Sequence, residues 1–195
     1  REGGRDNART FFDHVAHTVW GLGTRPAPPQ VLDWVSFHAP PLDSPALAAI
    51  KQLAVTVPVA LLLFYRTHMQ SGNTAVFDAL MHALAERGVR PLAYGVDSLK
   101  NPDSLAKLAA VVRGQGVDVV LNATAFAVAS PGESGASGPD ADLAEDSWHR
   151  HWAGDAPVLQ LITAGCDQAQ WQQDPHGLTP RDLAMQVVLP EVDGR

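Results

Sequence analysis

Apolar runs of strand length alternate with amphipathic stretches over most of the chain. Residues 57–64 form a nearly continuous apolar run, and the lack of alternation predicts a strand that is buried on both faces. Similar runs predict three more strands at residues 91–96, 117–121 and 158–162. Helical periodicity predicts helices over residues 74–87, from Asn101 or Asp103 onwards, over 167–172 and over 179–188.

This alternation predicts an α/β fold. Buried strands that alternate with amphipathic helices favour an open, mainly parallel sheet, with helices on both faces and right-handed crossovers. We therefore expect a three-layer α/β/α arrangement of the flavodoxin or Rossmann type. The expected order of the four predicted strands is 2-1-3-4.

The first part of the chain has a different pattern. Residues 7–21 predict a helix capped by Asp6 or Asn7, with an apolar face made of Phe11, Phe12, Val15, Val19 and Trp20. Residues 21–45 are rich in proline, so we expect no regular structure there, with Trp34 and Phe37 as anchors onto the body. A short helical patch follows at 46–53. The predicted division is an N-terminal helix and Pro-rich linker at 1–56 and a parallel α/β domain at 57–195.

Composition narrows the class of protein. The net charge of −7, without a run of Lys or Arg, argues against a nucleic acid or an anionic membrane as partner. No apolar stretch reaches the ~20 residues that span a bilayer. The single cysteine, Cys166, is compatible with a reducing cytoplasm. Charged residues make up only 18%, and the chain opens on Arg1 rather than Met, so we expect a segment of a longer protein whose neighbours cover part of its surface.

Candidate chemistry gathers after the first and third predicted strands, because the carboxyl ends of parallel strands meet at one edge of a sheet. The side chains expected there are those of Tyr65, Arg66, His68, Gln70, Ser71, Asn73, Asn122, Thr124 and Phe126. Arg66 can pair with a carboxylate, and the backbone N–H groups near Gly72 and Asn73 can receive an anion. The alternative is structural: Ser71 or Asn73 caps a helix, and Asn122 ties two loops together. The Ser-Gly-Asn-Thr turn at 71–74 lacks the glycine patterns of nucleotide-binding loops. The Gly-x-Ser-x-Gly elbow that carries the nucleophile of many hydrolases does not occur in the sequence either.

Other acidic, imidazole and thiol groups are weaker candidates. Glu191 and Asp193 lie in an acidic turn after a predicted helix, where two carboxylates can bind a hard cation or act as a base, or can simply be solvated. His14 with His17, and His149 with His151 and Asp146, have spacings that a metal can use, but polar side chains packed at a surface are the more common explanation. Cys166 has no evident base nearby and is interpreted as a packed small residue.

Five stretches occur in the order found in one known family. They are Phe-Tyr-Arg-Thr-His-Met-Gln-Ser-Gly-Asn-Thr at 64–74, Ser-Leu-Lys at 98–100, Leu-Asn-Ala-Thr-Ala-Phe at 121–126, Gly-Leu-Thr-Pro-Arg-Asp-Leu-Ala at 177–184, and Leu-Pro-Glu-Val-Asp-Gly at 189–194. The opening residues 1–7 add to the match. The chain resembles the family formed by the large subunit of aerobic cobaltochelatase (CobN) and the H subunit of magnesium chelatase, and the resemblance covers essentially its whole length.

The resemblance implies a function. The cobalt branch binds the tetrapyrrole hydrogenobyrinic acid a,c-diamide and inserts Co²⁺ on the way to cobalamin, while separate AAA+-type subunits use ATP and Mg²⁺. It implies Glu191 as a catalytic carboxylate for proton removal or metal handling, and Arg66, His68, Ser71 and Asn73 as contacts to the macrocycle. Asn122 and Thr124, from the loop expected at the same edge, are further candidates for binding it, and Asp193 is the candidate for a metal contact. Such a chain would need the remainder of its own large subunit. Two alternatives stay open: a non-catalytic small-ligand module or scaffold, and the magnesium-chelatase equivalent acting on protoporphyrin IX.

Overall fold

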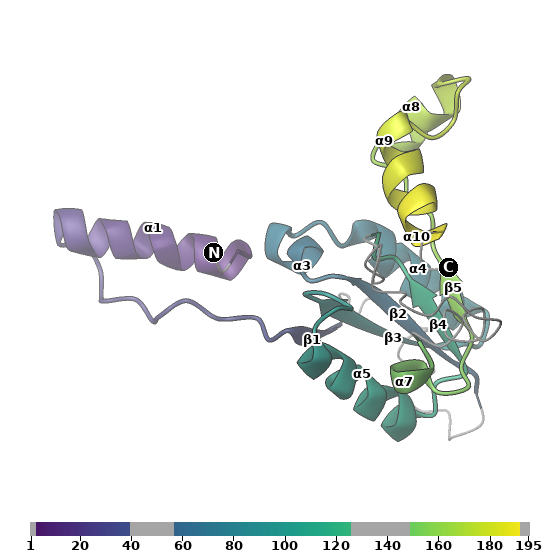
Figure 1. Ribbon diagram of the computed structural model, residues 1–195. Coiled ribbons are helices and arrows are strands. Elements are labelled where there is room, and N and C mark those ends of the chain that lie inside the picture. The colour runs from purple at the N-terminus through teal and green to yellow at the C-terminus, as the bar shows by residue number, and fades with distance from the viewer. Residues whose placement is uncertain (1–2, 40–56, 126–148, 192–195) are drawn as a thin grey trace, which may run out of the picture.

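The computed structural model describes residues 3–39, 57–125 and 149–191 (Figure 1). The helices are α1 (Arg5–Trp20), α3 (Thr67–Ser71), α4 (Ala75–Glu86), α5 (Pro102–Gln115), α7 (Arg150–Ala153), α8 (Gln168–Gln173), α9 (Pro180–Leu183), the π-helical turn η1 (Ala184–Val188) and α10 (Leu189–Glu191). The strands are β1 (Val35–His38), β2 (Val59–Tyr65), β3 (Arg90–Val96), β4 (Val119–Asn122) and β5 (Val158–Gln160). The predicted patch at 46–53 lies outside the described residues.

The five strands form one sheet in the order β1-β3-β2-β4-β5. Strands β3, β2, β4 and β5 are parallel, so the predicted α/β class and the predicted order of the four sequence-derived strands are confirmed. Strand β2 lies at the centre, and all of its residues from Val59 to Phe64 are buried. This burial on both faces explains why the strand shows no alternation of polar and apolar residues.

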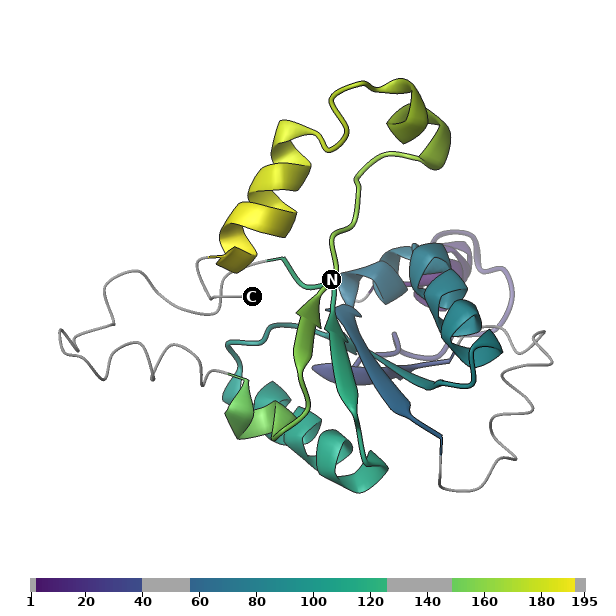
Figure 2. The same ribbon diagram turned by 90° about the vertical axis from the view of Figure 1, so that its right-hand side faces the viewer.

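Two apolar clusters pack on the sheet, one on each face. Figure 2 shows the helices that lie on the two sides of the sheet. On one side Leu61 and Leu63 of β2 pack with α5 and with Trp152 of α7. On the other side Leu62 and Phe64 pack with α4, where the ring of Phe64 stacks on a phenylalanine ring at a centroid distance of 4.2 Å. The predicted three-layer arrangement is therefore present.

The antiparallel edge strand β1 corrects the expectation that residues 21–45 lack regular structure. Val35 pairs with Val96, and the ring of Phe37 meets that of Tyr94 edge to face at 5.4 Å. The prolines of the segment lie on either side of β1 rather than within it, so they interrupt no ladder bond. Residues 35–38 thus belong to the sheet, while the division at residue 56 stays a prediction because residues 40–56 are outside the described part.

Helix α1 lies where the sequence predicts a helix, but it begins at a different capping residue. Its N-cap is Gly4, without a side-chain cap bond, rather than Asp6 or Asn7. The Asn7 amide instead bonds the backbone of Gln30 twice, as donor to its carbonyl oxygen and as acceptor from its N–H, both at 2.7 Å. Gly21 ends the helix in the left-handed conformation. Figure 1 shows α1 extending away from the sheet, with its N-terminal end nearest the body.

The C-terminal helices form an arm that leaves the sheet after β5 (Figures 1 and 2). Asp167 begins α8 and Thr179 begins α9, each through a capping box. The buried Asp182 carboxylate accepts hydrogen bonds from the Thr179 hydroxyl and from the backbone N–H of Gly165, at 2.8 and 3.1 Å. The arm continues through η1 and α10, so Glu191 ends a helix rather than standing in the predicted turn. Both views place α10 beyond the carboxyl ends of the parallel strands.

Candidate functional site

The loop after β2 folds into the short helix α3, which packs against the end of β3. A Cβ on Gly95 of β3 would lie 3.0 Å from the Cα of Arg66 and 2.5 Å from the Met69 sulfur, and because the Arg66 backbone cannot swing aside as a methionine side chain can, glycine favours this close approach. The N–H of Gly72 donates to the carbonyl of Met69, and that of Asn73 donates to the carbonyl of His68. These two N–H groups, which the sequence suggested as an anion site, are therefore already bonded within the loop.

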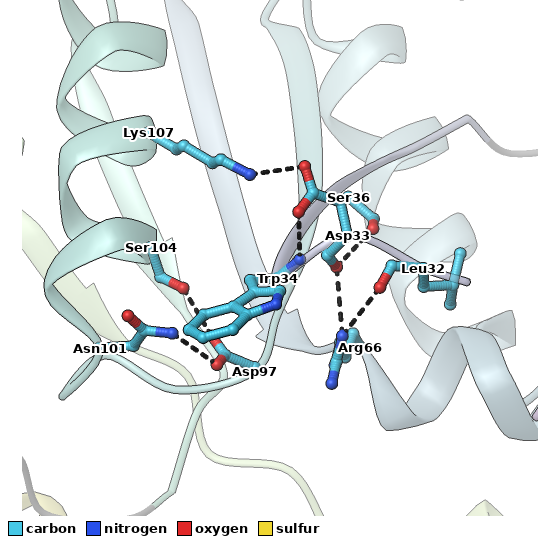
Figure 3. A network of polar contacts seen from close by, with 9 residues as sticks. All are labelled: Leu32, Asp33, Trp34, Ser36, Arg66, Asp97, Asn101, Ser104 and Lys107. Atoms are coloured by element: carbon cyan, nitrogen blue, oxygen red, sulfur yellow. Dashed lines mark hydrogen bonds and ion pairs between the residues drawn. The ribbon is translucent and has the colours of Figure 1, made fainter. Parts of the chain in front are cut away.

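Arg66 faces the N-terminal segment instead of an open edge (Figure 3). Its guanidinium donates to the carbonyl oxygens of Leu32 and Asp33, at 2.9 and 3.4 Å. Lys107 of α5 forms an ion pair with the Asp33 carboxylate. The hydrogen bond from Lys107 lowers the pKa of Asp33, as does the bond from the backbone N–H of Trp34. Arg66 thus holds the segment before β1 against the sheet.

Asp97 follows β3 and is the second acid of this network (Figure 3). Its carboxylate accepts from the Ser104 hydroxyl at 2.6 Å and from the Asn101 amide at 2.9 Å. Burial alone would raise the pKa of Asp97, but these bonds, the N–H of Ser98 and the charge of Arg66 outweigh it and lower the pKa. Asn101 is also the side-chain N-cap of α5, so of the two predicted helix starts, Asn101 and Asp103, the structure has the first.

His68 is a candidate that combines a titratable ring with partial exposure. The ring packs edge-on against Phe77 and Phe64, at centroid distances of 5.0 and 6.2 Å. Burial lowers the pKa of His68, and a hydrogen bond to the backbone of Asn73 opposes this shift. The lowered pKa favours the neutral imidazole, in which one ring nitrogen donates and the other accepts a hydrogen bond.

Ser71 and Asn73 are both exposed on the same loop. The Ser71 hydroxyl donates to the carbonyl of His68 at 3.2 Å. The N-cap of α4 is Thr74, so the alternative that Ser71 or Asn73 caps this helix is wrong. Their exposure leaves both side chains within reach of a ligand.

Asn122 and Thr124 are buried and bonded to each other and to β5. The Asn122 amide donates to Gln160 Oε1 at 3.0 Å, and its oxygen accepts from the Thr124 N–H at 3.1 Å and hydroxyl at 2.8 Å. Gln160 in turn donates to the carbonyl of Thr124 at 2.9 Å. The Tyr65 hydroxyl accepts from the N–H of Ala125 at 3.2 Å. Asn122 therefore ties the loop after β4 to the last residue of β5, which is a structural role. Position 126 lies outside the described residues.

The remaining acidic and imidazole candidates do not form a metal centre in the part of the chain that the structure describes. Glu191 is exposed at the end of α10, while Asp193 lies outside the described residues. Nowhere in residues 3–39, 57–125 and 149–191 do three or more His, Cys, Asp or Glu side chains converge as metal ligands would. His14 instead lies 3.5 Å from the Thr18 hydroxyl, and Asp146, the expected companion of the histidines at 149 and 151, is outside the described part.

Cys166 lies on the C-terminal arm. It is half-buried and lines a groove of about 390 Å³ beside Trp171. Such partial burial fits the interpretation of this cysteine as a packed small residue.

One polar pair was missed by the sequence analysis. His38 Nε2 lies 2.6 Å from Asp78 Oδ1, and the Thr74 hydroxyl donates to Asp78 Oδ2 at 3.0 Å. The pair joins the edge strand β1 to helix α4, and the His38 ring meets Phe64 edge to face. His38 and Asp78 are 40 positions apart in the sequence, so no local pattern links them. They come together only because residues 35–38 join the sheet as β1.

Comparison with known proteins places the chain in a family. The family model described as CobN/Magnesium Chelatase matches residues 1–195. The chain belongs to the CobN/magnesium chelatase family. Two curated relatives named aerobic cobaltochelatase subunit CobN, from Sinorhizobium sp and Pseudomonas aeruginosa, are 38% and 34% identical to it.

The solved structures include a similar member of the CobN/magnesium chelatase family. The structure titled catalytic subunit of cobaltochelatase from Mycobacterium tuberculosis matches with a TM-score of 0.72 and 31% identity. Each of these three matches covers 100% of this chain but only 15% of the relative. No helix among the described residues has the length and apolar character that a membrane span requires.

Proposed function

We propose that this chain is part of an ATP-dependent cobaltochelatase large subunit, which binds hydrogenobyrinic acid a,c-diamide and inserts Co²⁺ during cobalamin synthesis. The family match over residues 1–195 carries the proposal. The two curated relatives and the solved structure are all named for cobalt, which favours this branch over a magnesium-chelatase H subunit acting on protoporphyrin IX. The reaction takes place in the cytoplasm, and the segment contributes one wall of the site.

The expected macrocycle contacts fall into two groups with different roles. His68, Ser71 and Asn73 offer partly or fully exposed polar side chains on one loop at the carboxyl edge, where α/β sheets commonly bind ligands. A neutral imidazole, a hydroxyl and an amide suit the carboxylate and amide groups at the periphery of the macrocycle. Asn122 and the threonine at 124 are buried with their side chains bonded within the protein, so they act through the loop they hold. Arg66 holds the segment of Leu32 through Nη1.

Glu191 is proposed as the base of metal insertion. Replacing two pyrrole N–H protons by Co²⁺ requires a proton acceptor near the ring, and a carboxylate on an exposed helix end can serve. Asp193, two residues further along, is proposed to help handle the metal. ATP hydrolysis with Mg²⁺ is proposed to take place on separate AAA+-type partner subunits.

The test uses the full-length large subunit with its ATPase partners. We expect Glu191→Gln to reduce the rate of Co²⁺ insertion by about 100-fold or more while tetrapyrrole affinity is kept, since loss of a general base costs about 10²–10⁴ in rate. His68→Ala is expected to weaken tetrapyrrole binding, measured by absorbance titration. The matched control is Glu86→Gln, which changes an exposed glutamate at the end of α4.

A scaffold is the second candidate, because several of the expected contacts are bonded inside the protein. If Glu191→Gln and His68→Ala both leave affinity and insertion rate at wild-type values, the segment is a scaffold and the catalytic proposal is wrong. Full activity with Mg²⁺ and protoporphyrin IX, and none with Co²⁺, would instead assign the magnesium branch.

A further inference from the structure

Helix α1 and the residues just after it carry an apolar stripe that nothing in the described part of the chain covers. Its large side chains are more than 60% exposed: Phe11 61%, Phe12 69%, Val19 64%, Trp20 64% and Leu22 62%. Phe11 and Phe12 touch edge to face at 5.7 Å, and Val19 follows two turns further along the same side of the helix. Exposed apolar patches of this kind mark interaction sites.

The stripe continues into a groove between α1 and the candidate loop. The groove has a volume of about 750 Å³, and its walls come from the first turns of α1, from Pro29 and from residues 70–72. The helix is anchored near this end, where Asn7 bonds Gln30 and where a Cβ on Gly3 would lie 2.9 Å from Gln70. Groove and stripe together follow all 16 residues of the helix, which is roughly 24 Å at 1.5 Å per residue.

The shape and charge of this surface favour a protein helix over the substrate. The described lining of the groove carries no charged side chain and consists mostly of apolar residues and glycine, which suits the apolar face of a helix. A single macrocycle would also leave much of a surface of this length uncovered. An amphipathic helix laid along α1 would cover it, with apolar side chains at i, i+3, i+4 and i+7.

The length of the relatives points to the source of that helix. The chain covers only 15% of the curated relatives and of the solved catalytic subunit, so in them most of the polypeptide is covalently linked to the matching segment. A linked segment has an effective concentration in the millimolar range when the linker spans the distance, and this favours it over a separate copy.

We propose that the apolar stripe of α1 and the adjoining groove dock an amphipathic helix from another part of the same large-subunit polypeptide. This inference rests on the proposed function only in placing the chain within a large chelatase subunit. By lying along α1 and beside α3, the docked helix holds the loop of His68 and Ser71 against the rest of the subunit. The loop that is proposed to contact the macrocycle is then held in place by a helix from the same polypeptide, and not by a separate subunit.

Photo-crosslinking in the full-length subunit tests the proposal. Phe12 is replaced by p-benzoylphenylalanine, which keeps an aromatic ring at the position, and the matched control places the same residue at His14, an exposed position two residues on and so on the opposite side of the helix from Phe12. We expect irradiation to link position 12 to one peptide outside residues 1–195 of the same polypeptide, in a product that migrates as a monomer. The yield from position 14 should be at least tenfold lower.

Other products would overturn the proposal. A crosslink to a peptide within residues 1–195 would show that the segment covers its own stripe, and a dimer band would assign the surface to a second copy. A product with an ATPase partner would assign it to that subunit, and loss of the crosslink on adding tetrapyrrole would assign it to the substrate. Equal yields at the two positions would mean no specific docking.

Amide exchange provides a second measurement that does not depend on the crosslinker. In the full-length subunit, Val19→Ser should speed exchange in α1 and in the crosslinked peptide while β2 is unchanged, and an unaltered rate in that peptide would contradict the docking. The two proposals can fail separately. If the expected crosslink forms but Glu191→Gln inserts Co²⁺ at the wild-type rate, the docking proposal stands and only the proposed role of Glu191 is wrong.

Discussion

The roles of Asn122 and Asn73 can be separated by one matched pair of substitutions. Asn122 is fully buried, and its side chain makes three hydrogen bonds, to Gln160 Oε1 and to the N–H and hydroxyl of Thr124. Asn122→Ala removes all three. A net contribution of about 1 kcal/mol for each bond gives a loss of about 3 kcal/mol in the free energy of opening this part of the sheet, and more if Thr124 stays buried without a partner.

Hydrogen–deuterium exchange measured by mass spectrometry reads out this loss locally. The N–H of Leu161 bonds the carbonyl of Asn122 at 2.8 Å and that of Ala123 bonds the carbonyl of Leu63 at 2.7 Å, so both amides keep their partners after the substitution. When exchange occurs through local opening, about 3 kcal/mol corresponds to roughly 150-fold faster exchange of these amides. Because Asn122 is buried, Asn122→Ala should change tetrapyrrole affinity only indirectly, through any loosening of the loop that carries His68, Ser71 and Asn73.

Asn73→Ala is the control, because Asn73 is exposed on the loop. We expect a change in stability within about 0.5 kcal/mol, hence less than about threefold in exchange, together with weaker tetrapyrrole binding. The reasoning fails if Asn122→Ala leaves the exchange rates at their wild-type values but abolishes binding, since Asn122 would then contact the ligand directly.

Three further predictions concern the surroundings of the site loop. Gly95→Ala should destabilise the protein by about 1–3 kcal/mol, measured as a lower midpoint of urea unfolding, because the new methyl group would crowd the Arg66 Cα and displace the Met69 side chain. An unchanged midpoint would contradict this close packing. Asp97 has a lowered pKa in the folded state, so its carboxylate stabilises the fold above the ordinary value of 3.8, and this contribution is lost as pH falls through the lower folded value. Asp97→Asn should flatten the pH dependence of unfolding in that acidic range, and an identical profile would refute the assignment. Arg66→Met should speed proteolysis around Leu32, whose carbonyl loses its donor, and unaltered cleavage would show that Arg66 does not hold this segment.

Much of the fold is predictable from local pattern. The unbroken apolar run of β2 predicts its burial, and the periodicity of α4 and α5 predicts helices on both faces of a parallel sheet. Asn101 is recognisable as a helix start because its cap bond spans only two residues, to Asp103. Family membership also follows from the sequence, since several motifs in a fixed order are specific together when each alone is weak.

Only the tertiary structure decides how the polar residues at the sheet edge divide their roles. Sequence pattern brings Arg66, Asn122 and His68 to the same edge. However, Arg66 bonds Leu32 and Asn122 bonds Gln160, and both of these partners lie far away in the chain. Strand β1 escapes prediction for the same reason, because four residues between prolines become a strand only through pairing with β3. Local periodicity reports which face of an element is buried, whereas the satisfaction of each polar group depends on contacts between elements, and those exist only in the folded chain.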